Sequence, residues 1–164
     1  MPILDRNMLE FVSRSPEQTR RLGMRLGSML QSGDIVCLNG DLGSGKTTFV
    51  QGLAQGWGSL DLVTSPTFVL VNQYQCMDGG TMFHLDAYRM QNALEAEDLD
   101  LVQMIDSGCL VVEWPEKIRE ALPEECLWIE MKYVADESRQ MAFNPIGERY
   151  IAILDEFRRA AFGG

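Results

Sequence analysis

Residues 38–50, LNGDLGSGKTTFV, constrain the fold of this chain more than any other segment. They continue the apolar run 35–38 and contain the pattern G-x-x-x-x-G-K-[ST] at residues 40–47. Small glycines allow consecutive backbone N–H groups to turn toward one anion, and a helix that begins behind them directs its positive end at the same point. The segment therefore predicts a strand, a phosphate-binding loop and a helix in succession.

The rest of the chain predicts further strands and helices. Short strands are expected at residues 8–13, 34–39 and 109–114, a hairpin at 67–75 and 81–89 around the turn MDGG, and an antiparallel pair within 127–145. Helices are expected at 15–33, 46–57, 92–105 and 147–162. The first has Ser15 as N-cap, Gln18 completing a capping box and Gly33 just past its end, and the last places Tyr150, Ile153, Leu154 and Phe157 at core spacing.

This order of elements predicts the α/β class, as a three-layer sandwich like that of P-loop NTPases with a mixed, partly antiparallel sheet. At 164 residues the chain fits a single P-loop domain over residues 1–164. In such sheets the ligand binds at the carboxyl ends of the strands, where the glycine-rich loop lies.

The net charge of −10 argues against an extended surface for nucleic-acid phosphates, so we expect no DNA partner and only indirect contact with RNA. The four cysteines are far apart and accompany a single histidine, which indicates neither a zinc site nor a disulfide framework. No apolar run approaches the roughly 20 residues of a membrane span, and the first residues lack the pattern of a signal peptide. We therefore expect no membrane association and a cytoplasmic location.

Lys46 is positioned by the loop pattern to reach the β- and γ-phosphates of a nucleotide, and the Thr47 hydroxyl to bind Mg²⁺. Hydrolysis also needs a carboxylate on the metal side. Glu113 ends the apolar run 110–112, where such an acid would lie at a strand end beside the loop. The competing interpretation of Glu113 is an acid at the surface.

His84 and Asp86 are two residues apart in FHLDAY, so on a strand they share one face. They could act together, although a lone histidine is as often a structural residue. Thr67 in TSPTF can supply a hydroxyl to Mg²⁺ or the γ-phosphate from a loop. The guanine-reading pattern N-K-x-D does not occur in the sequence.

The motifs GDLGSGKTTF, TSPTF, HLDAYR and VVEWPEK, in this order, resemble those of the bacterial TsaE (YjeE) family of small P-loop ATPases. The resemblance implies an enzyme that binds and hydrolyses ATP, with ATP/ADP and Mg²⁺ as cofactors. It implies a role in forming threonylcarbamoyladenosine next to the tRNA anticodon, on the complex of the proteins TsaD and TsaB. Such proteins hydrolyse ATP poorly alone and better with that pair.

Carried over by position, the resemblance assigns roles to residues of this chain. Thr47 and Glu113 would bind Mg²⁺, and Lys46, Thr67, His84, Asp86 and Glu113 would be catalytic. Trp114 would pack under the site, Thr19 would lie near the adenine, and Arg139 near a loop that closes the adenine pocket. The phosphates would be held by Asp41, Leu42, Gly43, Ser44, Gly45, Lys46, Thr47 and Thr48.

Two departures from the family pattern stand out. Ala87 replaces a larger residue in the H-x-D-x-Y-R motif, and residues 136–150 match no family pattern. Two other functions remain open from the sequence. One is a module that binds a partner according to its bound nucleotide without essential turnover, and the other is a small-molecule kinase.

Overall fold

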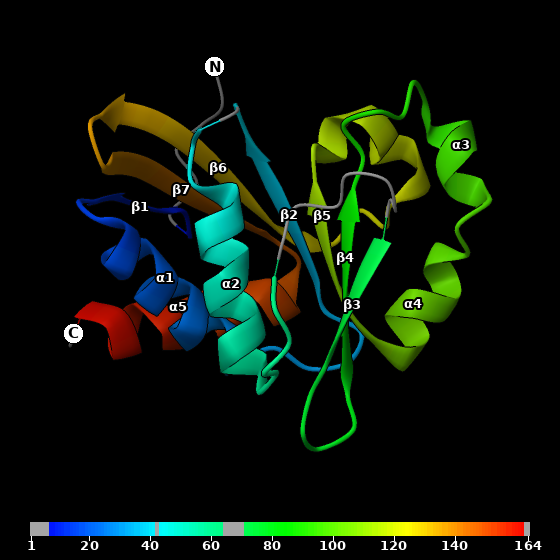
Figure 1. Cartoon of the computed structure of the whole chain (residues 1–164), viewed down its shortest axis with the longest axis horizontal. Helices are drawn as coiled ribbons and strands as arrows, with labels where there is room; N and C mark the ends of the chain where they lie inside the picture. The colour runs from blue at the N-terminus through cyan, green and yellow to red at the C-terminus, as the bar shows by residue number, and fades with distance from the viewer. Residues whose placement is uncertain (1–6, 42, 64–70, 163–164) are drawn as a thin grey trace.

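A computed structural model of the chain describes residues 7–41, 43–63 and 71–162. Its strands form one seven-stranded sheet in the order β1-β7-β6-β2-β5-β4-β3 (Figure 1). Strands β2, β4, β5 and β6 are parallel where they adjoin, and β1, β7 and β3 pair antiparallel. The mixed α/β sheet predicted from the sequence is confirmed.

The strands are β1 (Leu9–Ser13), β2 (Ile35–Gly40), β3 (Val71–Gln75), β4 (Thr81–Asp86), β5 (Gly108–Glu113), β6 (Cys126–Ala135) and β7 (Ser138–Ile146). The helices are α1 (Pro16–Gly27), α2 (Lys46–Trp57), α3 (Ala93–Glu97), α4 (Leu101–Ser107), α5 (Glu148–Phe162) and the 3₁₀ segment η1 (Pro115–Ala121). One apolar core lies between the sheet and α1, α2 and α5, and a second lies against α3, α4 and η1. Helices thus cover both faces of the sheet (Figure 1).

Two predicted helices have different ends in the structure. The first ends at Gly27, six residues before Gly33, because the Ser28 hydroxyl caps the Arg25 carbonyl and the chain turns back toward the sheet. The acidic helix predicted at residues 92–105 is two helices, α3 and α4. Asp100 separates them with a left-handed backbone (φ 54°), and its side chain accepts a hydrogen bond from the Gln103 N–H at 3.4 Å. An aspartate that bonds to nearby backbone competes with helix continuation.

Helices α1 and α2 contact each other through glycines. A Cβ atom on Gly52 of α2 would lie 2.1 Å from the Arg20 carbonyl oxygen, and one on Gly27 of α1 would lie 2.2 Å from that of Leu53. Neither position has room for a side chain. This backbone contact brings the N-terminal end of α1 to the same end of the molecule as the start of α2.

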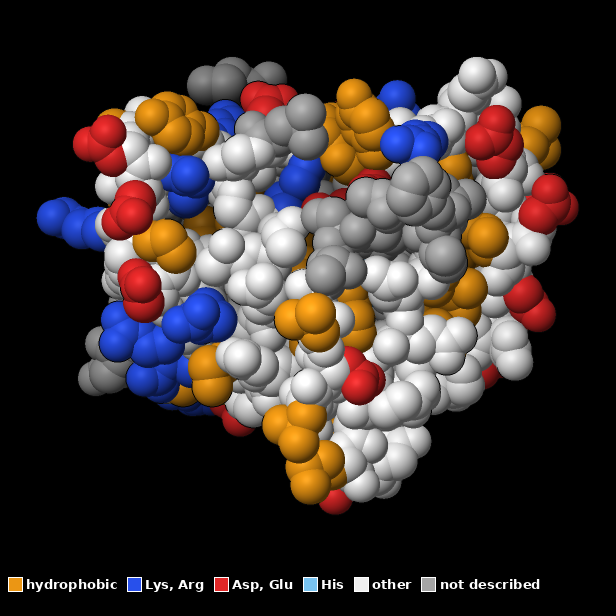
Figure 2. Space-filling model, in the orientation of Figure 1, with side chains coloured by type: hydrophobic (Ala, Val, Ile, Leu, Met, Phe, Trp, Pro, Cys, Tyr) orange, Lys and Arg blue, Asp and Glu red, His pale blue; other side chains and the backbone are white. Residues whose placement is uncertain are grey.

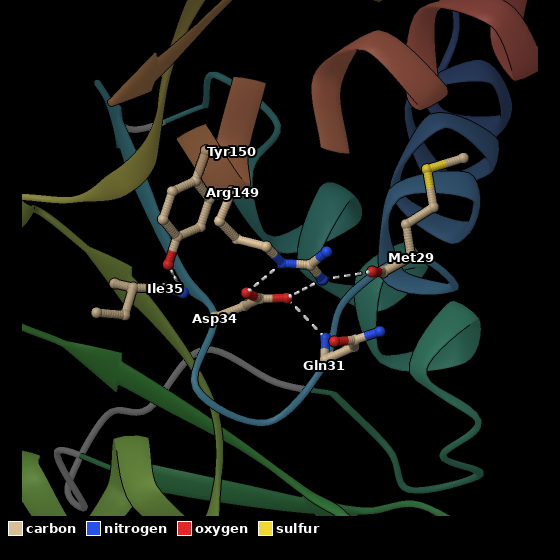
Figure 3. Close-up of polar contacts among 6 residues, drawn as sticks. All are labelled: Met29, Gln31, Asp34, Ile35, Arg149 and Tyr150. Atoms are coloured by element: carbon tan, nitrogen blue, oxygen red, sulfur yellow. Dashed lines mark hydrogen bonds and ion pairs between the residues drawn. The ribbon is translucent and has the colours of Figure 1, made fainter. Parts of the chain in front are cut away.

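Polar contacts attach the start of β2, the end away from the glycine-rich loop, to α5 (Figure 3). Arg149 donates to both carboxylate oxygens of the buried Asp34, at 3.1 and 2.9 Å, and the Gln31 N–H donates to one of them at 2.7 Å. The Tyr150 hydroxyl accepts the Ile35 N–H at 2.9 Å. These bonds join the start of β2 to α5.

Tyr150→Phe is expected to destabilise the protein at neutral pH by about 1–3 kcal/mol, because the buried Ile35 N–H loses its acceptor. Burial raises the pKa of the Tyr150 hydroxyl to about 12. An unfolded tyrosine ionises near pH 10, so the stability that neutral Tyr150 contributes is complete below about pH 10 and is lost as pH rises toward 12. The difference between the wild type and the variant should therefore shrink over this interval in urea unfolding. A constant difference would contradict the assignment.

Along the described part of the chain, no helix has the length and apolar character needed to cross a membrane. Figure 2 shows Lys and Arg side chains gathered over α1 and α5, whereas acidic side chains predominate on the side of α3 and α4. Arg21 and Arg25 of α1 and Arg159 of α5 are exposed. The Arg25 guanidinium donates to the Ala160 carbonyl of α5 at 2.7 Å.

Candidate nucleotide site

The predicted phosphate loop, residues 40–47, connects the carboxyl end of β2 to the start of α2. Gly43 and Gly45 have φ angles of 81° and 96°, which side-chain-bearing residues rarely adopt. Gly40 is required for space, because its Cβ would lie 2.4 Å from the Met131 carbonyl oxygen. Glycine is therefore required at Gly43 and Gly45 by the backbone conformation and at Gly40 by the lack of space. The strand, loop and helix occur as predicted.

The Ser44 side chain supports an anion in this loop. The residue is 1% exposed, and its hydroxyl oxygen has no hydrogen-bond partner within the described ranges. A buried hydroxyl without a partner costs about 1–3 kcal/mol. A phosphate oxygen would satisfy it, so the loop fits the group that its sequence predicts.

Lys46 is the first residue of α2 and is 6% exposed. Its ammonium donates to the Gly40 carbonyl oxygen and lies 4.0 Å from the centre of the Trp114 ring. Burial lowers the pKa of Lys46, and the carboxylates of Glu113, Asp86 and Asp41 oppose this shift. The loop thus holds a buried cation next to acidic groups.

Glu113 and Asp86 end neighbouring strands, β5 and β4, and lie directly opposite each other in the register. Glu113 is also paired with Leu38 of β2, so it adjoins the strand that leads into the phosphate loop. Burial raises the pKa of Asp86, an effect that the hydrogen bond from the Tyr88 N–H opposes. Both predicted acids therefore lie at the carboxyl edge of the sheet, as the sequence analysis expected of Glu113.

Trp114 follows Glu113 with a left-handed backbone (φ 57°). Its backbone N–H donates to the Leu38 carbonyl at 3.3 Å, and its ring lies 5.0 Å from that of Tyr88 between centres. A non-glycine residue in this conformation costs about 1–2 kcal/mol. The strained backbone places the indole beneath the Lys46 ammonium, which agrees with the predicted packing of Trp114 under the site.

His84 is completely buried, and its Nε2 lies 2.6 Å from the Glu113 Oε2. Its Nδ1 lies 2.8 Å from the Tyr74 hydroxyl. Both ring nitrogens are thus occupied within the protein. The structure places His84 behind Glu113, where it supports the carboxylate. Tyr74 was not predicted at the site, because a strand tyrosine at alternating spacing has no distinguishing local signal.

Thr19, on α1, and Arg139, on β7, were predicted near the adenine, and both adjoin Ser13 of β1. The Thr19 hydroxyl lies 2.6 Å from that of Ser13, which donates to the Ser15 carbonyl at 3.1 Å. Ser13 is paired with Arg139 in the register. The Arg139 Cγ would lie 3.5 Å from a Cβ on Gly45, so its side chain borders the phosphate loop.

Of the other predicted site residues, Asp41 and Gly43 are exposed, and Thr47 and Thr48 are partly buried at the start of α2. Thr67 and Leu42 lie outside the described residues. Within the described ranges, no group of three His, Cys, Asp or Glu side chains could hold a metal ion. Magnesium suits such a site nonetheless, because it is held by one or two protein ligands with phosphate oxygens and water. Thr47 and Glu113 are the ligands that the sequence predicts.

Comparisons with known proteins agree with these features. The family model of the threonylcarbamoyl adenosine biosynthesis protein TsaE matches residues 13–141. The tRNA threonylcarbamoyladenosine biosynthesis protein TsaE of Bacillus subtilis (strain 168) is 38% identical over 153 residues, covering 92% of this chain and 94% of that protein. The protein of the same name from Streptomyces coelicolor is 42% identical over 137 residues, covering 80% and 93%. The crystal structure of Bacillus YdiB matches with a TM-score of 0.78 and 33% identity, covering 94% of this chain and 96% of that one.

Proposed function

The chain belongs to the TsaE family of threonylcarbamoyl adenosine biosynthesis proteins, and on that premise we propose that it binds and hydrolyses ATP to support this tRNA modification. The observation that carries the proposal is the buried Lys46 ammonium, set in a glycine-rich loop beside the acids Glu113 and Asp86. A buried cation with backbone N–H groups around it is a binding site for phosphates. Hydrolysis also needs a carboxylate on the metal side and a group that orients water, and the adjacent acids would supply both.

The loop and Lys46 stabilise charge. In phosphoryl transfer the developing charge lies on phosphate oxygens, and the protein contributes mainly position and electrostatic stabilisation. Lys46 would exchange its bond to the Gly40 carbonyl for a bond to a phosphate oxygen. ATP would supply the transferred group, and Thr47 and Glu113 would hold Mg²⁺, which would neutralise charge on the phosphates. The Ser44 hydroxyl would gain the partner that it lacks.

We assign to Asp86 the role of orienting the attacking water, because it ends β4 directly opposite Glu113. Burial raises the pKa of its carboxyl group, which makes the carboxylate a stronger base. The carboxylate also lies close enough to Lys46 and Glu113 for their charges to affect one another. His84 would act on the phosphates only through Glu113.

We propose further that the proteins TsaD and TsaB are the partners, that tRNA is reached through them, and that the chain works in the cytoplasm. Low activity of the isolated chain would follow if a partner completes the site. Helices and loops that border an active site often become ordered only when a ligand or partner binds.

ATP turnover of the purified chain, with and without the TsaB–TsaD pair, tests this function. We expect slow release of free phosphate alone and a clear increase with the pair. Nucleotide binding without any increase in turnover would instead support a nucleotide-dependent binding module. Formation of ADP without free phosphate, when metabolites are present, would indicate a kinase. Either result would overturn the ATPase proposal.

A further inference from the structure

A buried chain of hydrogen bonds runs from the edge strand β3 to the proposed metal-binding acid. The Tyr74 hydroxyl lies 2.8 Å from Nδ1 of His84, and Nε2 of His84 lies 2.6 Å from Oε2 of Glu113. Their exposed fractions are 2%, 0% and 3%. The three side chains are therefore shielded from water and joined to one another by hydrogen bonds.

The register of the strands explains why these residues meet. Tyr74 on β3 is opposite Met82, two residues before His84 on β4. His84 is opposite Val111, two residues before Glu113 on β5. Residues two apart on a strand point to the same face. Each step of the chain thus crosses one strand and moves two residues toward the carboxyl edge of the sheet.

The direction of each bond follows from which atoms can donate. An ionised carboxylate only accepts, so Nε2 of His84 must carry the proton in its bond to Glu113. In a neutral imidazole the other nitrogen is then an acceptor, and Nδ1 receives the Tyr74 O–H. A tyrosine hydroxyl can serve as either donor or acceptor, and this site requires the donor.

We infer that Tyr74 is a positioning residue, which donates to Nδ1 of His84 and holds the ring with its Nε2–H on Oε2 of Glu113, so that Oε1 would be the oxygen available to a metal. The metal part of this inference rests on the proposed function, whereas the tautomer does not. Groups that orient a metal ligand through hydrogen bonds typically account for 10- to 100-fold in metal affinity. Tyr74 would act on Mg²⁺ without contacting it.

The tautomer is directly measurable because the chain contains a single histidine. With ¹⁵N-labelled histidine, NMR should show one protonated nitrogen, Nε2, and one unprotonated nitrogen, Nδ1. In Tyr74→Phe we expect Nε2 to stay protonated, because Glu113 still accepts its hydrogen bond, and the Nδ1 resonance to shift, because Nδ1 has lost its donor. A wild-type spectrum with both nitrogens protonated, or with the proton on Nδ1, would overturn the inference whether or not Tyr74→Phe folds and whether or not the protein hydrolyses ATP.

The effect on the metal is measured by ADP binding at increasing Mg²⁺ concentration. Tyr74→Phe should require about tenfold more Mg²⁺, with unchanged affinity for ADP when Mg²⁺ is absent. Tyr150→Phe is the matched control, because it removes another buried hydroxyl at the opposite end of β2 and should leave the Mg²⁺ dependence unchanged. In a Glu113→Ala background, Tyr74→Phe should have no further effect. An equal loss in both backgrounds would show that Tyr74 does not act through Glu113.

Discussion

Lys46→Ala is expected to lower ATP turnover in the presence of the partner pair about 10²- to 10³-fold, the loss typical of removing one group that stabilises transition-state charge. The structure gives the reason for so large an effect. The ammonium is buried in the loop, between the Gly40 carbonyl and the Trp114 ring. The only other lysines of the chain, Lys117 and Lys132, belong to η1 and β6.

The fold should tolerate this change. Burial lowers the pKa of Lys46, so the charged side chain is held at a cost that alanine does not incur. We expect the free energy of unfolding to fall by no more than about 1 kcal/mol. Lys132→Ala, at an exposed position of β6, is the control and should leave turnover unchanged. Turnover that survives Lys46→Ala would refute the assigned role of the loop.

Gly52→Ala is expected to lower the free energy of unfolding by about 3 kcal/mol, the upper part of the usual range for overpacking. This sign is opposite to helix propensity, which favours alanine over glycine by about 1 kcal/mol. The added Cβ would lie 2.1 Å from the Arg20 carbonyl oxygen, an atom of the α1 backbone that cannot rotate away. The two helices would have to separate.

Thermal unfolding provides the measurement. For a chain of this size, 3 kcal/mol corresponds to a fall in Tm of about 6–12 °C. Gln55→Ala, at an exposed position of the same helix, should change stability by no more than about 0.5 kcal/mol. A Gly52→Ala protein as stable as the wild type would mean that α1 and α2 are not in backbone contact.

Local signals predicted the elements that contain strong turn or capping residues. The Ser15 N-cap accepts the Gln18 N–H at 3.1 Å, and the turn before β4 closes the predicted hairpin. The predicted ends failed where a side chain bonded to the nearby backbone. Asp100 accepts the Gln103 N–H between α3 and α4, and α1 ends at Gly27, where the Ser28 hydroxyl donates to the Arg25 carbonyl. Neither contact is encoded in the spacing of apolar residues.

The candidate site shows the same division. The loop pattern identified Lys46 and Thr47, and the end of an apolar run identified Glu113, because these signals are contiguous in the chain. The contact of Tyr74 with His84 depends on strand register, and the meeting of Arg139 with Gly45 joins segments far apart in the sequence. The net charge of −10 likewise did not predict how charges are distributed over the surface, because a sum does not reveal the basic groups gathered over α1 and α5 (Figure 2).

The sequence by itself determined the phosphate loop, because the φ angles of Gly43 and Gly45 and the reach of Lys46 are local consequences of residue type. It also carried the motifs that indicate the family. Only the tertiary structure decided what surrounds that loop. Pairing of β4 with β5 places His84 behind Glu113 and Asp86 opposite it, and the turn at Trp114 brings its ring beneath Lys46. Those contacts join distant residues, so they depend on how the strands align in the sheet.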